Sequence, residues 1–308
     1  MKICYQPQNF RDEALAAIRR AVEILESYAQ RGYDLTLRQL YYQFVARGWI
    51  PNKDSEYKRL GEIISAGRMA GLIDWAHIVD RTRNLRSLAH WDSPEGIVAA
   101  CARQFRLDKW AEQPECVEVW VEKDALIGVL QVACEPLDVA YFSCRGYTSQ
   151  SEMWSAAMRL LERLDEGKRV TVLHFGDHDP SGIDMTRDIE DRLSLFIRHH
   201  DGLALERFQV RRVALNMDQV AAYAPPPNPA KVTDSRARDY IERYGSESWE
   251  LDALPPEAIT ELIRGAVGEL RSAPLWEQAR QSEEQGREDL TLVAASWAEA
   301  VDLLRGPA

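Results

Sequence analysis

Residues 170–182 read VTVLHFGDHDPSG, an apolar run that ends in a short acidic turn. The run predicts a buried strand, and the turn places Asp177 and Asp179 directly after it. Further apolar segments cover residues 117–122, 137–143 and 208–215, and helical segments cover 124–134, 149–165 and 181–200. Because strands that alternate with helices form parallel sheets covered on both faces, this part of the chain is predicted to be an α/β domain.

Acidic residues follow two of the predicted strands. Ligands of open α/β sheets bind beyond the carboxyl ends of the strands, where Asp177, Asp179 and the strand-terminal Glu122 are expected. Three carboxylates at one edge disfavour their shared ionised state unless a cation joins them, and carboxylate oxygens suit Mg²⁺. Two alternatives stay open. The turn acids can be solvated residues and a helix cap, and Glu122 can pair with Lys123 or Arg145.

The first 110 residues show helical periodicity instead. Amphipathic helices are expected over residues 11–30, from the Thr36 N-cap to Gly48, and after residues 52–55. Residues 72–83 follow as a short apolar segment with basic flanks, which predicts a strand. The sequence therefore suggests an N-terminal winged helix-turn-helix domain over residues 1–110, followed by the α/β domain over residues 111–308.

The formal net charge of −11 hides an asymmetry between these two parts. Residues 1–110 carry 17 Lys and Arg against 13 acids, whereas residues 111–308 carry 21 against 36. Since phosphate binding depends on Lys and Arg, the basic part is the candidate DNA-binding module. The candidate phosphate contacts are Arg47, Lys53, Lys58, Arg59, Arg68, Arg81, Arg83 and Arg86.

Composition is that of an ordinary globular protein, with 308 residues, 45% hydrophobic and 28% charged. The longest apolar stretch, residues 126–134, is far shorter than the roughly 20 residues that span a bilayer. The five cysteines include no Cys-x-x-Cys pair and form no spaced zinc set with the histidines. No apolar signal core follows Met1. We therefore expect reduced thiols, a cytoplasmic location and no membrane segment.

Three motifs occur in a fixed order, VEKDA at 121–125, CRGYTS at 144–149 and DHDPSGID at 177–184. A strand-terminal Glu followed by Asp-x-Asp resembles the Toprim domain. The ordered set resembles the A subunit of topoisomerase VI and the related meiotic double-strand-break protein, and WELDAL at 249–254 resembles a later segment of that family. The resemblance spans roughly residues 33–270. His178 departs from the small residue common there, and the chain is shorter than a typical A subunit.

The same family has an Arg-x-x-Tyr-Tyr segment that carries its DNA-cleaving tyrosine, and this chain has RQLYY at 38–42. The resemblance selects Tyr42. At 100° per residue, Tyr41 falls within the apolar stripe of its helix, and Tyr42 falls at the edge of the exposed face beside Arg38. A phenol that attacks a phosphodiester must lose its proton and needs charge stabilisation, which Arg38 can supply. The alternative is that both tyrosines only pack.

The resemblance implies Mg²⁺-dependent cleavage of double-stranded DNA by tyrosyl transesterification. Tyr42 would be the nucleophile, assisted by Arg38, and Glu122, Asp177 and Asp179 would hold Mg²⁺, with Glu122 also in the catalytic set. A homodimer is implied, in which the tyrosine of one subunit works with the acids of the other. The chain has no Gly-x-x-x-x-Gly-Lys-Ser/Thr loop, so ATP-driven strand passage would need a separate ATPase subunit.

Two other functions fit the same residues. One is a Toprim nuclease that hydrolyses DNA with metal-activated water, in which Tyr42 only packs. The other is a catalytically silent DNA-binding component of a larger complex, in which the acids are structural.

Overall fold

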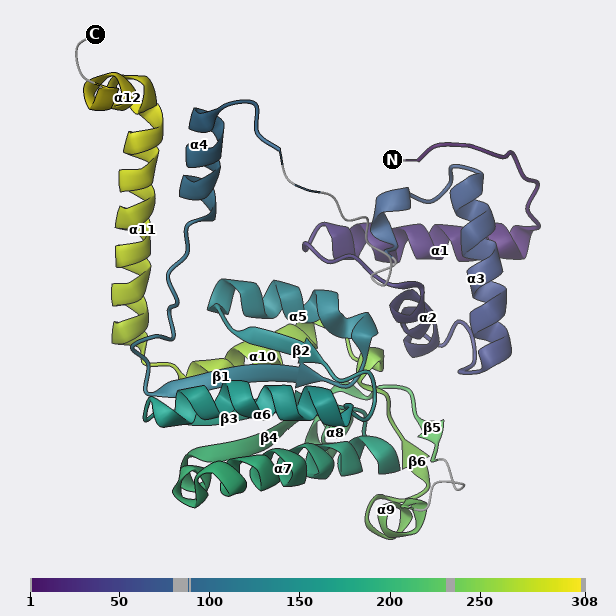
Figure 1. The fold of residues 1–308 in the computed structure, drawn as a ribbon. Helices are drawn as coiled ribbons and strands as arrows, with labels where there is room; N and C mark the ends of the chain where they lie inside the picture. Colours follow the sequence, from purple (N-terminus) through teal and green to yellow (C-terminus); the bar gives the residue numbers. More distant parts are fainter. Residues whose placement is uncertain (1, 80–87, 89, 231–235, 306–308) are drawn as a thin grey trace.

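The computed structural model describes residues 2–79, 88, 90–230 and 236–305 (Figure 1). At its centre lies a four-stranded parallel sheet in the order β2-β1-β3-β4. The strands are β1 (Glu115–Val121), β2 (Ala140–Ser143), β3 (Arg169–Phe175) and β4 (Phe208–Ala214). Val121 pairs with Phe175, so β1 and β3 end side by side. This order is compatible with a Toprim-like α/β domain.

Alternate side chains of the strands pack into two separate hydrophobic cores, one on each face of the sheet. The helices that cover the sheet are α5 (Ile127–Cys134), α6 (Gln150–Asp165), α7 (Pro180–His200) and α10 (Pro256–Leu270). Val119 and Val121 pack with α5 and α10, whereas Trp120 packs with α6 and α7 on the opposite face. Because both faces are covered, the strands are continuous apolar runs. The predicted α/β class is confirmed.

Three helices form the N-terminal part: α1 (Asp12–Ala29), α2 (Leu37–Ala46) and α3 (Asp54–Met69). Thr36 begins α2 with a reciprocal capping box, in which its hydroxyl accepts from the Gln39 amide and its own amide donates to the Gln39 side chain. Leu40 and Phe44 of α2 are buried against α1 and α3. The predicted helices are therefore present, with the Thr36 cap as expected.

The strand predicted over residues 72–83 is wrong for the part that the structure describes. Trp75–His77 is a short 3-10 helix that Asp74 caps, and Ile78 makes only an isolated bridge to Leu35. Residues 80–83 lie outside the described residues. The apolar segment turns inward to cover the three helices instead of extending as a strand, and a winged helix is not established.

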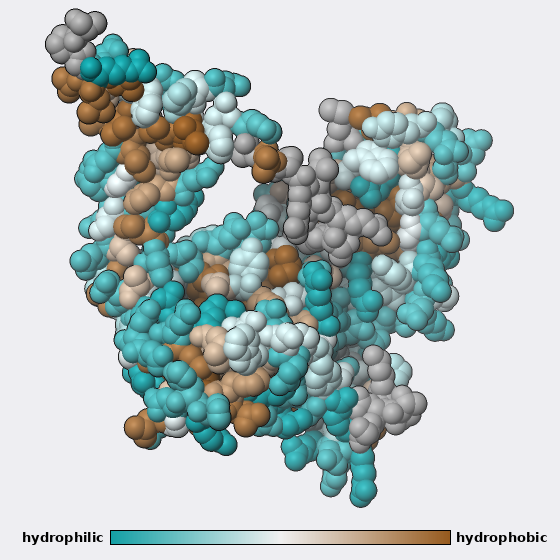
Figure 2. Space-filling model, in the orientation of Figure 1, coloured by the Kyte–Doolittle hydropathy of each residue, from teal (hydrophilic) through white to brown (hydrophobic). Residues whose placement is uncertain are grey.

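A pair of helices projects away from the sheet. The long α11 (Ala273–Ala295) packs along α4 (Pro94–Gln104), and α12 (Trp297–Arg305) follows at the far end (Figure 1). Glu283 of α11 accepts from the Leu107 amide and the Lys109 ammonium, which ties the middle of α11 to the segment that joins α4 to β1. Apolar surface is visible near its tip in Figure 2, where Leu303 and Leu304 are exposed.

The chain after β4 returns to the carboxyl edge of the sheet. It contains α8 (Met217–Tyr223), β5 (Asn228–Pro229), α9 (Ala237–Tyr244), β6 (Glu247–Ser248) and the 3-10 turn η5 (Leu251–Ala253). Trp249 bridges to His178 in the acidic turn, and Ala253 is buried among the N-terminal helices. Residues 248–253, called the bridging segment below, thus contact both parts of the molecule. Among the helices described, none combines the length and apolarity needed to cross a membrane.

Candidate functional site

Hydrogen bonds within the acidic turn after β3 fix the start of α7. Asp179 caps α7, because its Oδ1 accepts from the Gly182 amide at 2.6 Å and from the Ser181 hydroxyl at 2.9 Å. A Cβ atom on residue 182 would lie 2.2 Å from the Asp177 carbonyl oxygen, so only glycine fits there. Asp179 is therefore a helix cap, as the alternative interpretation expected.

Glu122 and Asp177 meet at the carboxyl edge of the sheet. The Asp177 amide donates to Glu122 Oε2 at 2.8 Å. The ion pairs considered for Glu122 go elsewhere, since Arg145 contacts Asp124 and Lys123 contacts Asp177. The sheet register thus brings together the two acids that follow neighbouring strands.

Lys123 is the centre of a partly buried ionic cluster. Its Nζ lies 2.9 Å from Asp177 Oδ2, from Glu250 Oε2 and from Asp252 Oδ1. Asp177 Oδ1 also accepts from the Leu251 amide at 2.8 Å. The bridging segment therefore attaches to the strand edge through an ammonium group shared by three carboxylates.

The N-terminal helices reach the same cluster through α2. The Tyr42 hydroxyl donates to Glu250 Oε2 at 2.6 Å, and Arg38 Nη2 lies 2.7 Å from the same oxygen. Arg38 Nη2 is also 3.4 Å from the Tyr42 hydroxyl, and its Nε is 3.2 Å from Asp252 Oδ2. Arg38 and Tyr42 thus lie side by side, as the helical spacing predicted.

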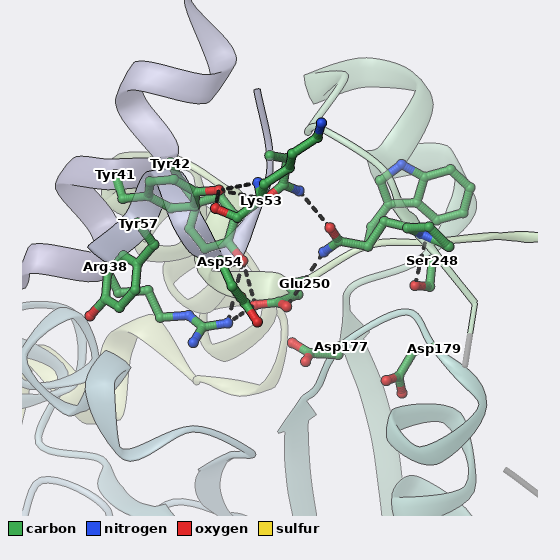
Figure 3. A pocket seen from close by; sticks show the side chains of 14 residues that line it. Arg38, Tyr41, Tyr42, Lys53, Asp54, Tyr57, Asp177, Asp179, Ser248 and Glu250 are labelled. Atoms are coloured by element: carbon green, nitrogen blue, oxygen red, sulfur yellow. Dashed lines mark hydrogen bonds and ion pairs between the residues drawn. The ribbon is translucent and has the colours of Figure 1, made fainter. Parts of the chain in front are cut away.

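A cavity of about 180 Å³ joins these groups (Figure 3). Arg38 and Tyr42 line it from α2, Asp177 and Asp179 line it from the acidic turn, and Glu250 lies between the two sets. Five of its lining residues come from other segments near α3 and β5: Asn52, Lys53, Asp54, Tyr57 and Asn228. The candidate nucleophile and two of the candidate metal ligands therefore share one cavity in a single chain.

The predicted exposure of Tyr42 is wrong. Tyr42 is 3% exposed and Tyr41 is 4% exposed, so both tyrosines are buried. Tyr41 points into the helical core as predicted and bonds Asn52 and Lys53. Tyr42 does leave the apolar stripe of α2, but Glu250 of the bridging segment covers the side that the helix alone would expose.

Burial controls the protonation of this cluster. It raises the pKa of Asp177 to about 8 even with the Lys123 ammonium alongside, and it also raises the pKa of Asp252. Burial opposes ionisation of Glu250, but the donors around that carboxylate outweigh burial and lower its pKa to about 2. Burial and the neighbouring carboxylates raise the pKa of Tyr42. Tyr42 is therefore a neutral phenol bound to an ionised Glu250.

Arg212 of β4 fixes the acidic turn from behind. Its guanidinium donates to the carbonyl oxygens of Gly176, Asp177 and Gly182 at 3.1, 2.6 and 2.8 Å. His174 lies beside it, where burial and the Arg212 charge lower the histidine pKa to about 3. Arg212 thus sets the direction in which the turn presents its carboxylates.

The strand-edge carboxylates fit Mg²⁺ in part. Within the described part of the chain, Glu122 Oε1 and Asp179 Oδ2 accept no hydrogen bond, whereas both Asp177 oxygens are occupied by Leu251 and Lys123. Mg²⁺ takes one or two carboxylates and keeps several waters, which suits Glu122 and Asp179. No group of three or more His, Cys, Asp or Glu side chains is arranged as a preformed metal site among the residues described.

Comparisons with known proteins do not add to the family resemblance. No model of a known protein family matches the chain, and no curated protein matches it. The functional argument therefore depends on the geometry of the site itself.

Three of the candidate phosphate contacts lie on the surface near α3. Lys53, Lys58 and Arg59 are exposed. Arg59 is already paired with Glu13 at 2.8 Å and with Glu56 at 2.8 Å. Lys53 also lines the cavity, which places one cation between the surface and Tyr42. This face of α3 is the described part of the predicted DNA-binding surface.

The other candidates are placed differently. Arg47 is exposed at the end of α2 and bonds Gln43, whereas Arg68 turns inward to the carbonyl oxygens of Trp75 and Ile78. Arg68 therefore closes the core and is not displayed for a phosphate. Arg81, Arg83 and Arg86 lie outside the described residues.

Sequence reasoning assigned no functional role to four residues of the site: Lys123, Arg212, Glu250 and Asp252. Lys123 stood next to Glu122 in a quoted motif, and WELDAL contained both further acids. Their signal was a family resemblance without an assigned role. Nothing in the sequence distinguished Arg212, because the role of an arginine inside a strand is evident only when the carbonyl oxygens that it contacts are known.

Proposed function

We propose that this chain cleaves double-stranded DNA by Mg²⁺-dependent transesterification, with Tyr42 as the nucleophile. The observation that carries the proposal is the shared cavity, which Tyr42 and Arg38 line together with Asp177 and Asp179. A nucleophile, a guanidinium group and carboxylates suited to a metal are the parts that phosphodiester cleavage requires. Their convergence from segments far apart in the chain supports a reaction site over four independent structural roles.

In the proposed reaction, the Tyr42 oxygen forms a bond to phosphorus while the bond from phosphorus to the leaving sugar oxygen breaks. The phenol loses its proton and the sugar oxygen gains one, so the step needs no further co-substrate. Arg38 is placed to bind a phosphate oxygen beside Tyr42, since its Nη2 is 3.4 Å from the hydroxyl. Because Tyr42 is neutral, its phenol must lose its proton before or while its oxygen attacks phosphorus.

Glu122 and Asp179 would hold Mg²⁺ at the strand edge, and Asp177 would join them when its ion pair with Lys123 opens. When bound, Mg²⁺ supplies charge stabilisation to the phosphate and leaving group. Arg212 keeps the carboxylates of the turn directed at this position through its contacts with the carbonyl oxygens of Gly176, Asp177 and Gly182.

The exposed cations at and near the start of α3 support duplex DNA as the substrate, because phosphate binding depends on Lys and Arg and one of them, Lys53, lines the cavity. A homodimer and a separate ATPase subunit belong to the same proposal, and both come from the family resemblance alone. The shared cavity adds one point: Tyr42 already lies near the acids of its own chain.

Incubation of the chain with supercoiled plasmid and Mg²⁺, followed by denaturation with and without protease, tests this function. Transesterification predicts cut DNA that carries covalently bound protein, released only by protease. Tyr42→Phe should abolish the adduct, and Tyr41→Phe is the matched control that should retain it. Cut ends without protein, at the same rate in Tyr42→Phe, would refute the nucleophile.

Hydrolysis of DNA by water is the second candidate, and the burial of Tyr42 favours it. The Tyr42 hydroxyl is bonded to Glu250, whereas Glu122 Oε1 and Asp179 Oδ2 have no partner in the described chain. In that reaction Tyr42 would only pack, and the DNA ends would carry a free phosphate. The same plasmid assay separates the two candidates.

A further inference from the structure

Three donors from two parts of the molecule converge on one oxygen atom. Glu250 Oε2 lies 2.6 Å from the Tyr42 hydroxyl, 2.7 Å from Arg38 Nη2 and 2.9 Å from Lys123 Nζ. The other oxygen, Oε1, has one long contact, to Asn228 Nδ2 at 3.4 Å. An anionic oxygen therefore occupies a site built from a hydroxyl, a guanidinium and an ammonium.

These donors are the groups with which proteins bind phosphate oxygens. Arginine and lysine both bind phosphate through charge-assisted hydrogen bonds, and a hydroxyl adds a further donor. A phosphodiester that Tyr42 attacks must bring an oxygen within reach of both Tyr42 and Arg38. The Glu250 carboxylate holds that position.

We infer that Glu250 is an internal competitor of the phosphate group, and that Tyr42, Arg38 and Lys123 form the oxyanion site it fills. The identity of the ligand as a phosphodiester rests on the proposed function. The inference adds Lys123 as a third phosphate contact and makes the described conformation a closed one. DNA binding then requires that the bridging segment, residues 248–253, withdraws its carboxylate.

The contacts of the segment with the N-terminal helices allow such an exchange, while Trp249 and Leu251 anchor the segment in the sheet core. Its contacts with the N-terminal helices are mainly polar, made by Glu250 and Asp252, and Ala253 is its buried apolar contact with them. Polar interfaces between parts of a chain permit relative motion. Tyr42 is also only 3% exposed, so its hydroxyl is closed to a DNA strand in this conformation.

Titration of the full chain with inorganic phosphate by calorimetry tests the competition. Glu250→Gln should bind phosphate about tenfold more tightly than the wild type, because the competing anion no longer fills the site. Glu247→Gln removes the same charge from an exposed position three residues away and is the matched control. Its affinity should equal that of the wild type. Arg38→Met added to Glu250→Gln should cancel the gain.

An affinity in Glu250→Gln no higher than in Glu247→Gln would overturn the inference. A second measurement uses the wild type alone and does not depend on how a variant folds. The Leu251 amide is bonded to Asp177, so withdrawal of the segment should speed its hydrogen exchange in phosphate relative to chloride at equal ionic strength. Unchanged exchange at saturating phosphate would equally refute the competition.

These readouts do not require DNA cleavage, so the inference and the proposed function fail separately. A chain that gains phosphate affinity in Glu250→Gln but never forms a protein-DNA adduct keeps the oxyanion site and loses transesterification. A chain that forms the adduct through Tyr42 while Glu250→Gln binds phosphate no better keeps transesterification and loses the competitor.

Discussion

Two tyrosines of this chain make the same hydrogen bond in different surroundings. Tyr42 donates to Glu250 at 2.6 Å, and Tyr147 donates to Asp184 at 2.6 Å. An arginine contacts each phenol, Arg38 in the first case and Arg236 in the second. Tyr42 is 3% exposed, whereas Tyr147 is 45% exposed. Bonding partners alone therefore do not mark a reaction site, and what distinguishes Tyr42 is its location.

The location of Tyr42 is distinguished by the acids at the strand edge. Tyr42 shares a cavity with Asp177 and Asp179, while Tyr147 does not line that cavity. Tyr147 lies over the first turns of α7, where Asp184 also contacts Arg187. The comparison separates a tyrosine that faces candidate metal ligands from one that stabilises a surface ion pair.

The largest difference is expected in covalent chemistry. Tyr42→Phe should eliminate the protein-DNA adduct, and Tyr147→Phe should keep it at the wild-type level, because only Tyr42 is next to the proposed phosphate position. Protease-sensitive mobility of cut plasmid on a denaturing gel measures both variants. Loss of the adduct in Tyr147→Phe but not in Tyr42→Phe would show that Tyr147, and not Tyr42, is the nucleophile.

The next largest difference is expected in Mg²⁺ affinity, between substitutions at the strand edge and a substitution beside Tyr147. Asp179→Ala should weaken Mg²⁺ affinity by about tenfold or more, on the scale seen when residues that support a metal site are removed. Asp177→Ala should have a smaller effect because that carboxylate is bonded to Lys123. Asp184→Ala beside Tyr147 is the control. Calorimetric titration with equal affinities in all three variants would remove the metal site from the strand edge.

Asp177 and Asp184 should also affect the free energy of unfolding, with opposite pH dependence. Burial raises the pKa of Asp177 from 3.8 to about 8, so the native state binds more protons and wild-type stability falls between about pH 4 and pH 8. Asp177→Asn should remove that fall. Burial opposes ionisation of Asp184, but bonds from Tyr147 and two arginines outweigh it and lower the Asp184 pKa.

The stability that Asp184 contributes is therefore present above its unfolded pKa and lost as the pH falls through the folded value. Asp184→Asn should flatten the acid side of the curve, and urea unfolding at several pH values measures both variants. Parallel curves for Asp177→Asn and the wild type would contradict the buried state of Asp177.

The smallest effect is expected for DNA affinity, since single surface contacts add little each. Lys58→Glu should weaken binding to all sequences alike and lower the log–log salt slope by about 0.9. Arg59→Glu should change the slope less, because Glu13 and Glu56 already pair with Arg59. Arg187→Glu beside Tyr147 is the charge-matched control. An equal slope change in Arg187→Glu would indicate that DNA binds to the sheet domain instead of to the face of α3.

Local patterns in the sequence predicted most of the helices and strands. Apolar runs such as residues 170–175 became strands buried on both faces, and the Thr36 cap and the turn at Asp179 began helices where expected. These features depend on neighbours within a few residues, which a sequence displays directly. The strand prediction is wrong at residues 72–79 because their apolar side chains pack back on the helices. A strand and a covering turn can have the same composition.

The parallel α/β fold, the acids at the ends of β1 and β3, and the Arg38 and Tyr42 pair on one helix edge could all be predicted from the amino-acid sequence. Each follows from a period of two or 3.6 residues and from the rule that parallel strands end at the same edge. The burial of Tyr42, the contact of Lys123 with Asp177 and the position of Glu250 between them are seen only in the folded chain. Helical spacing fixes a direction from one axis, whereas burial and ion pairing depend on which distant segment packs against that direction.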